Sequence, residues 1–253
     1  MTRIIAIVSG KGGVGKTTLV ANLGAALAGM GKDVIVLDAN LTTPNLGIHL
    51  GMPLFPVTLH DVLKGRAHIR DAIYDHESGM RVVPAGISLR DLRGVDAKDL
   101  PTALLDLLGN ADIILLDAAA GLGREALASI EAADEMIIIT NPDLPSVTDA
   151  LKAVKLAEQL GTRTLGVVVN RVTGAKHEMR REDIVSMLDD IELLSEIPED
   201  MNVPVAISAR TPIVIHKPGS RASHAVKKTA ARLVGRSYAI DKAWRQRLFG
   251  FLR

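Results

Sequence analysis

Nine residues near the N-terminus decide the fold, and they read Gly10-Lys11-Gly12-Gly13-Val14-Gly15-Lys16-Thr17-Thr18. An apolar stretch typical of a buried strand, Ile4–Ser9, precedes them, and a helical pattern, Lys16–Met30, overlaps their end. The segment satisfies G-x-x-x-x-G-K-[ST] in the strand, loop and helix setting of a phosphate-binding P-loop. A simple glycine-rich turn is the alternative, but it requires all three features to coincide by chance.

Each residue type in this loop has a chemical reason to be there. Glycines let backbone N–H groups curve around phosphate oxygens without obstruction by a Cβ. The helix that begins at Lys16 adds the partial positive charge of its N-terminus, and the lysine neutralises the β- and γ-phosphates. Thr17 is placed to ligate Mg²⁺, and Thr18 to donate to the α-phosphate. We therefore expect a nucleotide site formed by Gly12, Gly13, Val14, Gly15, Lys16, Thr17 and Thr18.

Apolar runs and helical patterns alternate along the rest of the chain. The runs are continuously apolar, which is typical of strands covered on both faces in a parallel sheet. We predict strands at Ile4–Ser9, Val34–Asp38, Met80–Pro84, Ile113–Asp117, Met136–Thr140 and Leu165–Asn170, with a shorter apolar run at Ile213–His216. We predict helices at Lys16–Met30, Leu100–Leu108, Pro145–Leu160, Glu178–Asp190 and Ser220–Gly235. This order predicts a single doubly wound α/β domain with a mostly parallel sheet.

Two of the predicted strands end in an aspartate, Asp38 and Asp117, each after an apolar run. Ligands of such sheets bind beyond the carboxyl ends of the strands. A carboxylate at that edge beside a P-loop can hold Mg²⁺ or a water bound to it. For either residue alone, an ordinary strand-end cap is the alternative. We expect Thr17, Asp38 and Asp117 to form the metal site.

The octapeptide Lys-Gly-Gly-Val-Gly-Lys-Thr-Thr at residues 11–18 resembles the deviant Walker A motif of the MinD/ParA family of P-loop ATPases. The segments that begin at the two aspartates resemble switch I and switch II of the family, and the resemblance covers residues 1–216. It implies an ATPase that binds ATP and Mg²⁺ and forms a sandwich dimer, in which Lys11 reaches the nucleotide of the other subunit. The catalytic residues that it implies are Lys11, Lys16, Asn40 and Asp117.

Two positions depart from the family pattern. Asn40 stands where the family usually has the aspartate that orients the attacking water, and Ala119 replaces a usual proline in switch II. A neutral amide holds a water, but it neither accepts a proton nor supplies the field of a carboxylate. Removing a catalytic carboxylate often lowers the rate by about 10²–10⁴. We expect nucleotide binding with slow hydrolysis, whether Asn40 is a natural variant or an engineered substitution that traps the ATP state.

Two further segments resemble the adenine-contacting sequences of the family. One is the end of the predicted strand at residues 167–171, and the other is Ile197-Pro198-Glu199-Asp200. An asparagine pairs with both a donor and an acceptor on a purine edge, and backbone groups near Pro198 complete such a contact. Ordinary polar loop residues are the alternative. The expected base-contacting residues are Asn170, Arg171, Pro198, Glu199 and Asp200.

Composition limits the possible functions further. The 253 residues include no cysteine, which excludes disulfides, a thiolate nucleophile and the cysteine-held iron–sulfur clusters of some proteins with this fold. No apolar run approaches the roughly 18 residues of a membrane span, and the N-terminal pattern predicts no secretory signal. Residues 1–215 carry 20 Lys and Arg against 28 Asp and Glu, whereas residues 216–253 carry 10 against 1. We therefore expect the C-terminal part to meet something anionic.

The last residues combine this positive charge with aromatic side chains. Four of the six aromatic residues lie in the final 16 positions. On a helix their apolar residues share one face and cations surround it, which is typical of an interfacial membrane helix and resembles the membrane-targeting C-terminus of bacterial MinD-type members. A last helix that packs on the body is the alternative. The expected membrane-contacting residues are Ile240, Trp244, Arg245, Arg247, Leu248, Phe249, Phe251 and Leu252.

These patterns predict a P-loop ATPase domain over residues 1–236 and an amphipathic membrane-targeting tail over residues 237–253. The expected protein is cytoplasmic and peripheral on the inner face of the cell membrane, where it positions the division site. Its expected partners are a second copy in the ATP state, an anionic membrane surface, and a protein inhibitor or activator of the division-site system. One alternative is DNA partition or another cargo-positioning role, with phosphates facing the basic stretch Arg221–Arg236. The other is an ATP-binding scaffold with little turnover. No DNA-reading motif is recognisable, so we expect no nucleic-acid partner.

Overall fold

One eight-stranded sheet runs through the computed structural model, which describes residues 1–238. The strands are β1 (Arg3–Val8), β2 (Val34–Asp38), β3 (Tyr74–Asp75), β4 (Arg81–Val83), β5 (Ile113–Asp117), β6 (Glu135–Thr140), β7 (Arg163–Val172) and β8 (Leu193–Pro198). Their order across the sheet is β3-β4-β2-β5-β1-β6-β7-β8, and every neighbouring pair is parallel except β3 with β4. The predicted doubly wound, mostly parallel architecture is therefore confirmed.

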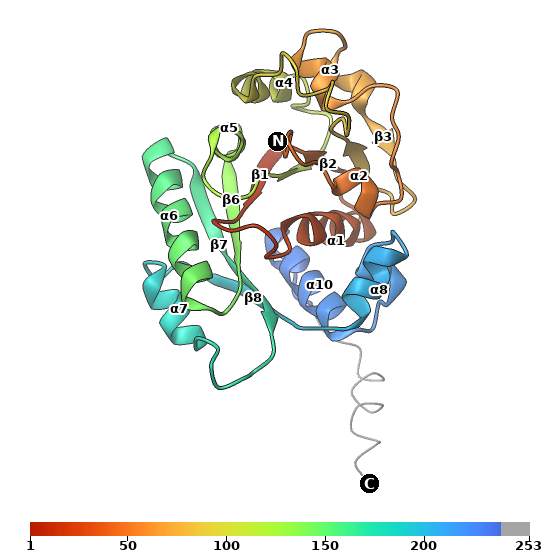
Figure 1. The fold of residues 1–253 in the computed structure, drawn as a ribbon. Helices are drawn as coiled ribbons and strands as arrows, with labels where there is room; N and C mark the ends of the chain where they lie inside the picture. Colours follow the sequence, from red (N-terminus) through yellow and green to blue (C-terminus); the bar gives the residue numbers. More distant parts are fainter. Residues whose placement is uncertain (239–253) are drawn as a thin grey trace.

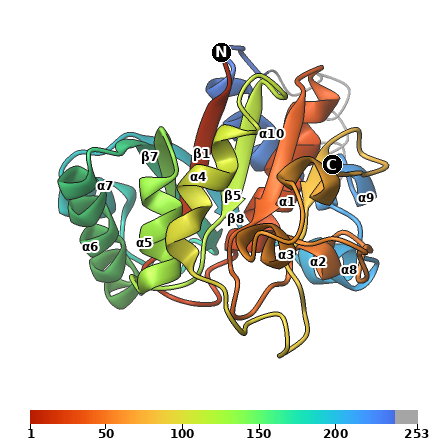
Figure 2. The same ribbon diagram turned by 90° about the horizontal axis from the view of Figure 1, so that it is seen from above.

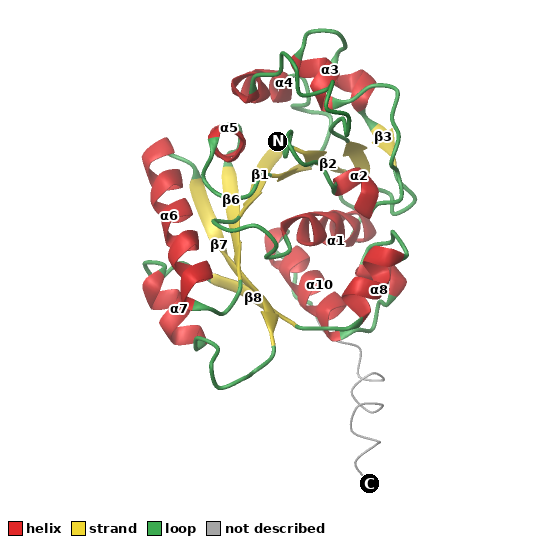
Figure 3. Ribbon diagram, viewed as in Figure 1, coloured by secondary structure: helices red, strands yellow, loops and turns green. Residues whose placement is uncertain are grey.

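Helices cover both faces of this sheet (Figures 1 and 2). One layer contains α1 (Lys16–Gly29), α2 (Leu46–His49), α8 (Asn202–Ser208), α9 (Ile213–His216) and α10 (Arg221–Leu233). The other contains α3 (Leu59–Leu63), α4 (Leu100–Leu105), α5 (Arg124–Glu131), α6 (Leu144–Leu160) and α7 (Arg181–Met187). Two 3₁₀ helices, η1 (Ile69–Ala72) and η2 (Ala97–Asp99), complete the described elements. Figure 3 shows the strands as a central layer between these helices.

The central strand β1 explains why the strands are continuously apolar. Ile5 and Ile7 pack into the layer that contains α1, whereas Ile4, Ala6 and Val8 pack into the opposite layer. Successive side chains of a strand point to opposite faces, so a sheet that is covered on both sides needs an apolar residue at every position. The aliphatic composition therefore serves two cores rather than one.

One predicted strand is wrong, because Ile213–His216 forms the short helix α9. The amides of Ile215 and His216 both donate to the Pro212 carbonyl, and the Val214 amide donates to Asn22 Oδ1 (3.1 Å). A four-residue apolar run cannot distinguish a buried strand from a buried helix. The strands β3 and β8 and the helices α2, α3, α5 and α8 were not predicted, and most of them are short.

The predicted tail falls largely outside the described residues. Its membrane-contacting positions Ile240, Trp244, Arg245, Arg247, Leu248, Phe249, Phe251 and Leu252 all lie beyond residue 238. Helix α10 ends at Leu233, close to the predicted end of the ATPase domain. Within residues 1–238, no helix combines the length and the apolar character that a bilayer span requires.

Candidate nucleotide site

The phosphate loop connects β1 to α1 at the carboxyl edge of the sheet, and two of its glycines are required by geometry. Gly15 has φ = 104°, and a Cβ there would lie 2.4 Å from the side-chain nitrogen of Asn170. A Cβ on Gly10 would lie 2.3 Å from the backbone oxygen of Asp149 in α6. Asn170 also donates through Nδ2 to the Val14 carbonyl (2.7 Å). The loop is thus fixed in shape by its own glycines and by the neighbouring strand β7.

Lys16 begins α1 and turns its ammonium group back into the loop. Nζ donates to Ser9 Oγ (3.1 Å), and Ser9 Oγ donates in turn to the Lys11 carbonyl (2.9 Å). Burial lowers the pKa of Lys16 below its ordinary value, although the nearby carboxylates of Asp117 and Asp38 raise it. The residue is therefore a buried ammonium that faces two carboxylates, and it is held in place before any ligand arrives.

The two strand-end aspartates lie side by side. Asp38 pairs in register with Asp117 across β2 and β5, and both side chains are buried. The Asp38 carboxylate accepts hydrogen bonds from the backbone N–H groups of Asn40 (3.2 Å), Asn45 (3.0 Å) and Leu46 (3.0 Å). Burial and the charge of Asp117 nevertheless raise the pKa of Asp38 well above its ordinary value.

Asp117 differs from Asp38 in the hydrogen bonding of its carboxylate. Neither of its carboxylate oxygens accepts a hydrogen bond of normal geometry from the described residues, although both oxygens are buried. Burial raises its pKa to about 6, while the nearby Thr17 hydroxyl and Lys16 ammonium act to lower it. Buried charges are normally paired or coordinate a metal. An unpartnered carboxylate beside Thr17, Lys16 and a second aspartate is a donor set that suits a hard cation such as Mg²⁺.

The segment at residues 39–46, here called the switch I loop, is closed on itself. Asn40 Nδ2 donates to the Thr43 carbonyl (2.7 Å), and its Oδ1 accepts from the Thr43 N–H (3.3 Å) and hydroxyl (3.1 Å). Glu125 at the start of α5 accepts from the Thr42 N–H (3.2 Å) and from the Thr42 hydroxyl. Both ends of the Asn40 amide are therefore occupied within the loop, and Glu125 ties the loop to α5.

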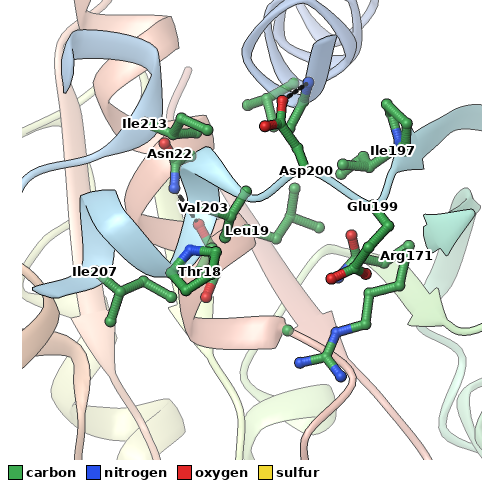
Figure 4. A pocket seen from close by; sticks show the side chains of 16 residues that line it. Thr18, Leu19, Asn22, Arg171, Ile197, Glu199, Asp200, Val203, Ile207 and Ile213 are labelled. Carbon is green, nitrogen blue, oxygen red and sulfur yellow. Dashed lines mark hydrogen bonds between the residues drawn. The ribbon is translucent and has the colours of Figure 1, made fainter. Parts of the chain in front are cut away.

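The predicted base-contacting residues come together in one cavity of about 150 Å³ (Figure 4). Asn170 and Arg171 reach it from β7, and Pro198, Glu199 and Asp200 reach it from the end of β8. Gly15 and Thr18 of the phosphate loop line the same cavity, so it opens directly beside the phosphate site. The predicted polar residues thus lie around one cavity, although sequence separates them by almost 30 positions.

Asp200 has a structural task as well. Its carboxylate accepts hydrogen bonds from the Asn202 N–H (3.0 Å) and side-chain amide (2.6 Å) and from the Ala222 N–H (3.2 Å). Burial raises its pKa, but these hydrogen bonds outweigh burial, and the pKa lies below its ordinary value. The carboxylate joins the starts of α8 and α10, so its side chain shapes the cavity wall.

The sequence did not indicate the apolar wall of this cavity. Leu19 contributes from α1, and Val203, Ile207, Ile213, Ala222 and Val226 contribute from α8 to α10. These residues carry no motif, and the strand β8 that places α8 was itself missed. Glu125 and Ser9 were also not predicted, because contacts across the sheet edge leave no local pattern. Lys11 lies exposed at the rim and makes no ion pair with the described residues.

A phosphate loop, an unpartnered strand-end carboxylate and an adjoining cavity at one sheet edge define a nucleotide-binding protein of the P-loop class. Residues 5–213 match the CbiA family, described as the CobQ/CobB/MinD/ParA nucleotide binding domain. The chain belongs to this family, and the predicted family resemblance is confirmed.

Individual relatives agree with this assignment. An uncharacterized ATP-binding protein of Methanocaldococcus jannaschii is 42% identical over 238 residues, which is 94% of this chain and 90% of that protein. The structure of the septum site-determining protein MinD of Pyrococcus horikoshii with Mg-ADP is similar at a TM-score of 0.89 and 37% identity, over 92% of this chain and 96% of that one. A MinC:MinD cell division protein complex of Aquifex aeolicus is similar at a TM-score of 0.84 and 33% identity, over 94% and 98%.

Proposed function

We propose that this protein is a MinD-like ATPase that binds Mg·ATP, dimerises and attaches to the inner face of the cell membrane to position the division site. The observation that carries the nucleotide part is the pre-shaped phosphate loop facing the unpartnered Asp117 carboxylate. The observation that carries the membrane part is the basic, aromatic composition of residues 237–253. Similarity to a solved MinD with Mg-ADP supports ATP and Mg²⁺ as the ligands.

The residues on either side of the loop fit such a ligand. Lys16 would neutralise the β- and γ-phosphates, and Thr17, Asp117 and the shell around Asp38 would hold Mg²⁺. When bound, the ion neutralises charge on the phosphate oxygens. The cavity beside Gly15 would take the base, with Asn170 and apolar residues of α8 to α10 in its lining.

Slow turnover follows from the state of Asn40. Its amide is satisfied by Thr43 on both sides, so it is not directed at the phosphate site. It also lacks the negative charge that would polarise an attacking water. We infer that the switch I loop must open before hydrolysis proceeds, and that even then the rate stays low. An ATP-binding scaffold with little turnover is the limiting case of this proposal.

In the proposed dimer, the exposed Lys11 contacts the nucleotide of the second subunit. The lysine stands at the rim of the phosphate loop without an ion-pair partner in residues 1–238, where a second subunit can bring its nucleotide. A protein inhibitor or activator of the division-site system is the further partner that we propose. Support for it is the similarity to a MinD captured with MinC.

Avidity turns dimerisation into membrane recruitment. The four Lys and Arg residues of the tail contribute at most about 4 kcal/mol near an anionic leaflet, and folding a short helix offsets part of this gain. A single tail therefore binds weakly, whereas two tails on one dimer gain about 10²–10⁴ in avidity. ATP binding would recruit the protein to the membrane, and hydrolysis would release it.

Co-sedimentation with anionic liposomes, with ATP and separately with ADP, tests this function. We expect ATP-dependent binding that is lost on truncation after Ser237. Matched assays with duplex DNA separate the partition alternative. Binding to DNA and not to liposomes would overturn the membrane role.

The described cations already weaken that alternative. Arg232 donates to the carbonyls of Leu193 and Leu194 and pairs with Glu192, and Arg236 donates to the Met30 carbonyl (2.8 Å). Lys227 donates to the Pro218 carbonyl (3.1 Å), so three cations of the basic stretch Arg221–Arg236 are engaged with the protein itself. DNA binding through phosphates requires such cations to be available.

A further inference from the structure

The short helix α8 presents apolar residues on its outer side as well as on its inner side. Val203 and Ile207 line the nucleotide-side cavity (Figure 4). Met201 is the N-cap of α8 and Val205 follows four residues later, so the two lie on the same side of the helix. Their side chains are 79% and 55% exposed. Ile215, on the adjacent helix α9, is exposed too. We call Met201, Val205 and Ile215 the outer apolar patch.

The segment that carries this patch is basic, although the exposed Glu199 and the buried Asp200 directly precede it. Residues 201–238 contain no Asp or Glu, and their Lys and Arg residues are Arg210, Lys217, Arg221, Lys227, Lys228, Arg232 and Arg236. Among these, Arg210, Lys217 and Lys228 are exposed and make no ion pair with the described residues. Exposed aliphatic side chains on a segment that also carries unpaired cations are a composition typical of a surface that meets anionic lipid.

The patch also lies near the start of the predicted tail. The Tyr238 hydroxyl is hydrogen-bonded to Nδ1 of His224 on α10 (2.7 Å). Two residues before His224, the Ala222 amide binds the Asp200 carboxylate, which directly precedes Met201. Less than one turn of α10 therefore separates the residue that holds Tyr238 from the contact that holds the start of α8. In Figure 1, α8 and α10 lie together below α1.

We propose that the outer apolar patch is a second membrane contact, which the body of the protein places on an anionic bilayer beside the tail. Met201, Val205 and Ile215 enter the headgroup region, and the exposed cations Arg210, Lys217 and Lys228 of the same segment meet lipid phosphates. The two contacts together fix the orientation of the nucleotide domain on the membrane. This inference rests on the proposed membrane attachment. A nucleic-acid surface has no use for the exposed Met201 and Val205, because nonspecific DNA binding depends on phosphate contacts.

The absence of cysteine allows a direct test. A V205C variant of the full chain is labelled with an environment-sensitive nitrobenzoxadiazole dye, and an L105C variant, 62% exposed at the other layer on α4, is the matched control. With Mg·ATP and vesicles of phosphatidylglycerol and phosphatidylcholine, we expect the label at position 205 to brighten about threefold and shift to the blue, because the dye leaves water. The label at position 105 should not change, and vesicles of phosphatidylcholine alone should have little effect.

A second pair of variants measures how much the contact contributes. The M201N/V205N double variant should bind the anionic vesicles about 5- to 10-fold more weakly than the native chain. The L105N/L108N double variant, which changes exposed leucines away from the patch, should bind normally. Both pairs change exposed positions, and thermal unfolding confirms that each variant folds.

The outcomes separate this inference from the proposed function. Tail-dependent vesicle binding with a silent label at position 205 and a normal M201N/V205N variant would overturn the second contact alone. A native chain that fails to sediment with vesicles would overturn the membrane function and this contact with it. A response of the label to duplex DNA and not to vesicles would replace lipid with nucleic acid as the partner.

Discussion

The phosphate loop and the switch I loop lie at the same edge of the sheet, but they are prepared to different degrees. In the phosphate loop, Lys16 already faces an unpartnered Asp117, and Gly15 is locked against Asn170. In the switch I loop, the polar side chains of Asp38 and Asn40 are satisfied by the loop's own backbone. The fold therefore supplies a phosphate loop that is already formed for nucleotide binding and a switch I loop that must rearrange before hydrolysis. Tight binding with slow turnover is the behaviour that this difference predicts.

The largest effect should follow from a substitution in the phosphate loop. The substitution Lys16→Ala removes the ammonium that faces the phosphates, and we expect ATP affinity to fall by more than about 100-fold. Equilibrium titration with a fluorescent ATP analogue measures the loss. The control is Lys98→Ala, an exposed lysine of η2 outside the site. A K16A variant with native affinity would show that the loop does not bind phosphate as described.

The next largest effect should come from placing a carboxylate at position 40 of the switch I loop. In Asn40→Asp, a carboxylate replaces the amide that donates to the Thr43 carbonyl, so the loop loosens and gains the missing charge. We expect kcat for ATP hydrolysis to rise by about 10- to 1,000-fold. Asn40→Ala is the matched variant, because it loosens the loop without adding charge. Equal turnover in the native and N40D chains would refute the role given to this position.

Asp117 offers a test in which stability and binding move in opposite directions. Its raised pKa of about 6 means that the metal-free native state takes up a proton more readily than the unfolded chain. This group's contribution to stability therefore falls as pH rises from about 4 to about 6. Asp117→Asn removes the buried charge, so without Mg²⁺ at pH 7 we expect unfolding to cost about 1–3 kcal/mol more. Thermal melts from pH 4 to 8 measure this.

The same variant should lose the nucleotide-dependent part of its stability. Mg·ATP should raise the melting temperature of the native chain and leave that of D117N nearly unchanged. If D117N melted below the native chain in metal-free buffer at pH 7, Asp117 would be a structural residue with partners that the orphaned oxygens do not indicate.

The smallest effect concerns the contact between the switch I loop and α5. Glu125→Ala removes the acceptor of the Thr42 N–H and hydroxyl, so amides of residues 40–46 should exchange hydrogen about 5- to 10-fold faster. ATP affinity should change by less than about threefold, since Glu125 does not line the phosphate loop. Thr42→Val is the partner variant, because it keeps the N–H and removes only the hydroxyl. Unchanged exchange in E125A would mean that Glu125 does not hold the loop.

The sequence predicted the parts of this site that are local. The phosphate loop and both aspartates follow apolar strands, and parallel strands carry their ends to one edge, so a motif and a strand pattern suffice. Predicting the register of Asp38 with Asp117 required the sheet order, which depends on packing between distant segments. The occupied state of Asn40 and the tie through Glu125 are contacts between loops, and no periodicity encodes them.

The sequence did not predict the helix α9 or the apolar wall of the cavity. Ile213 and Val214 are both buried, and Pro212 sets the first turn, but the same four residues fit a strand equally well. The helix α8 follows a strand that was not predicted, so its inner and outer apolar faces emerged only from the three-dimensional arrangement. In a sequence, apolar residues that line a site cannot be distinguished from core residues, because the pattern does not show which of them are exposed.

Recovery of the bound nucleotide tests the contrast between the two loops most directly. The native chain is incubated with ATP, with and without Mg²⁺, freed of unbound nucleotide and denatured, and the nucleotide is identified by chromatography. We predict Mg²⁺-dependent binding of about one nucleotide per chain, recovered chiefly as ATP, under conditions in which N40D yields ADP. A native chain that retains no nucleotide would contradict a phosphate loop that is formed for binding. A native chain that yields ADP as fast as N40D would contradict a switch I loop that is unready for hydrolysis.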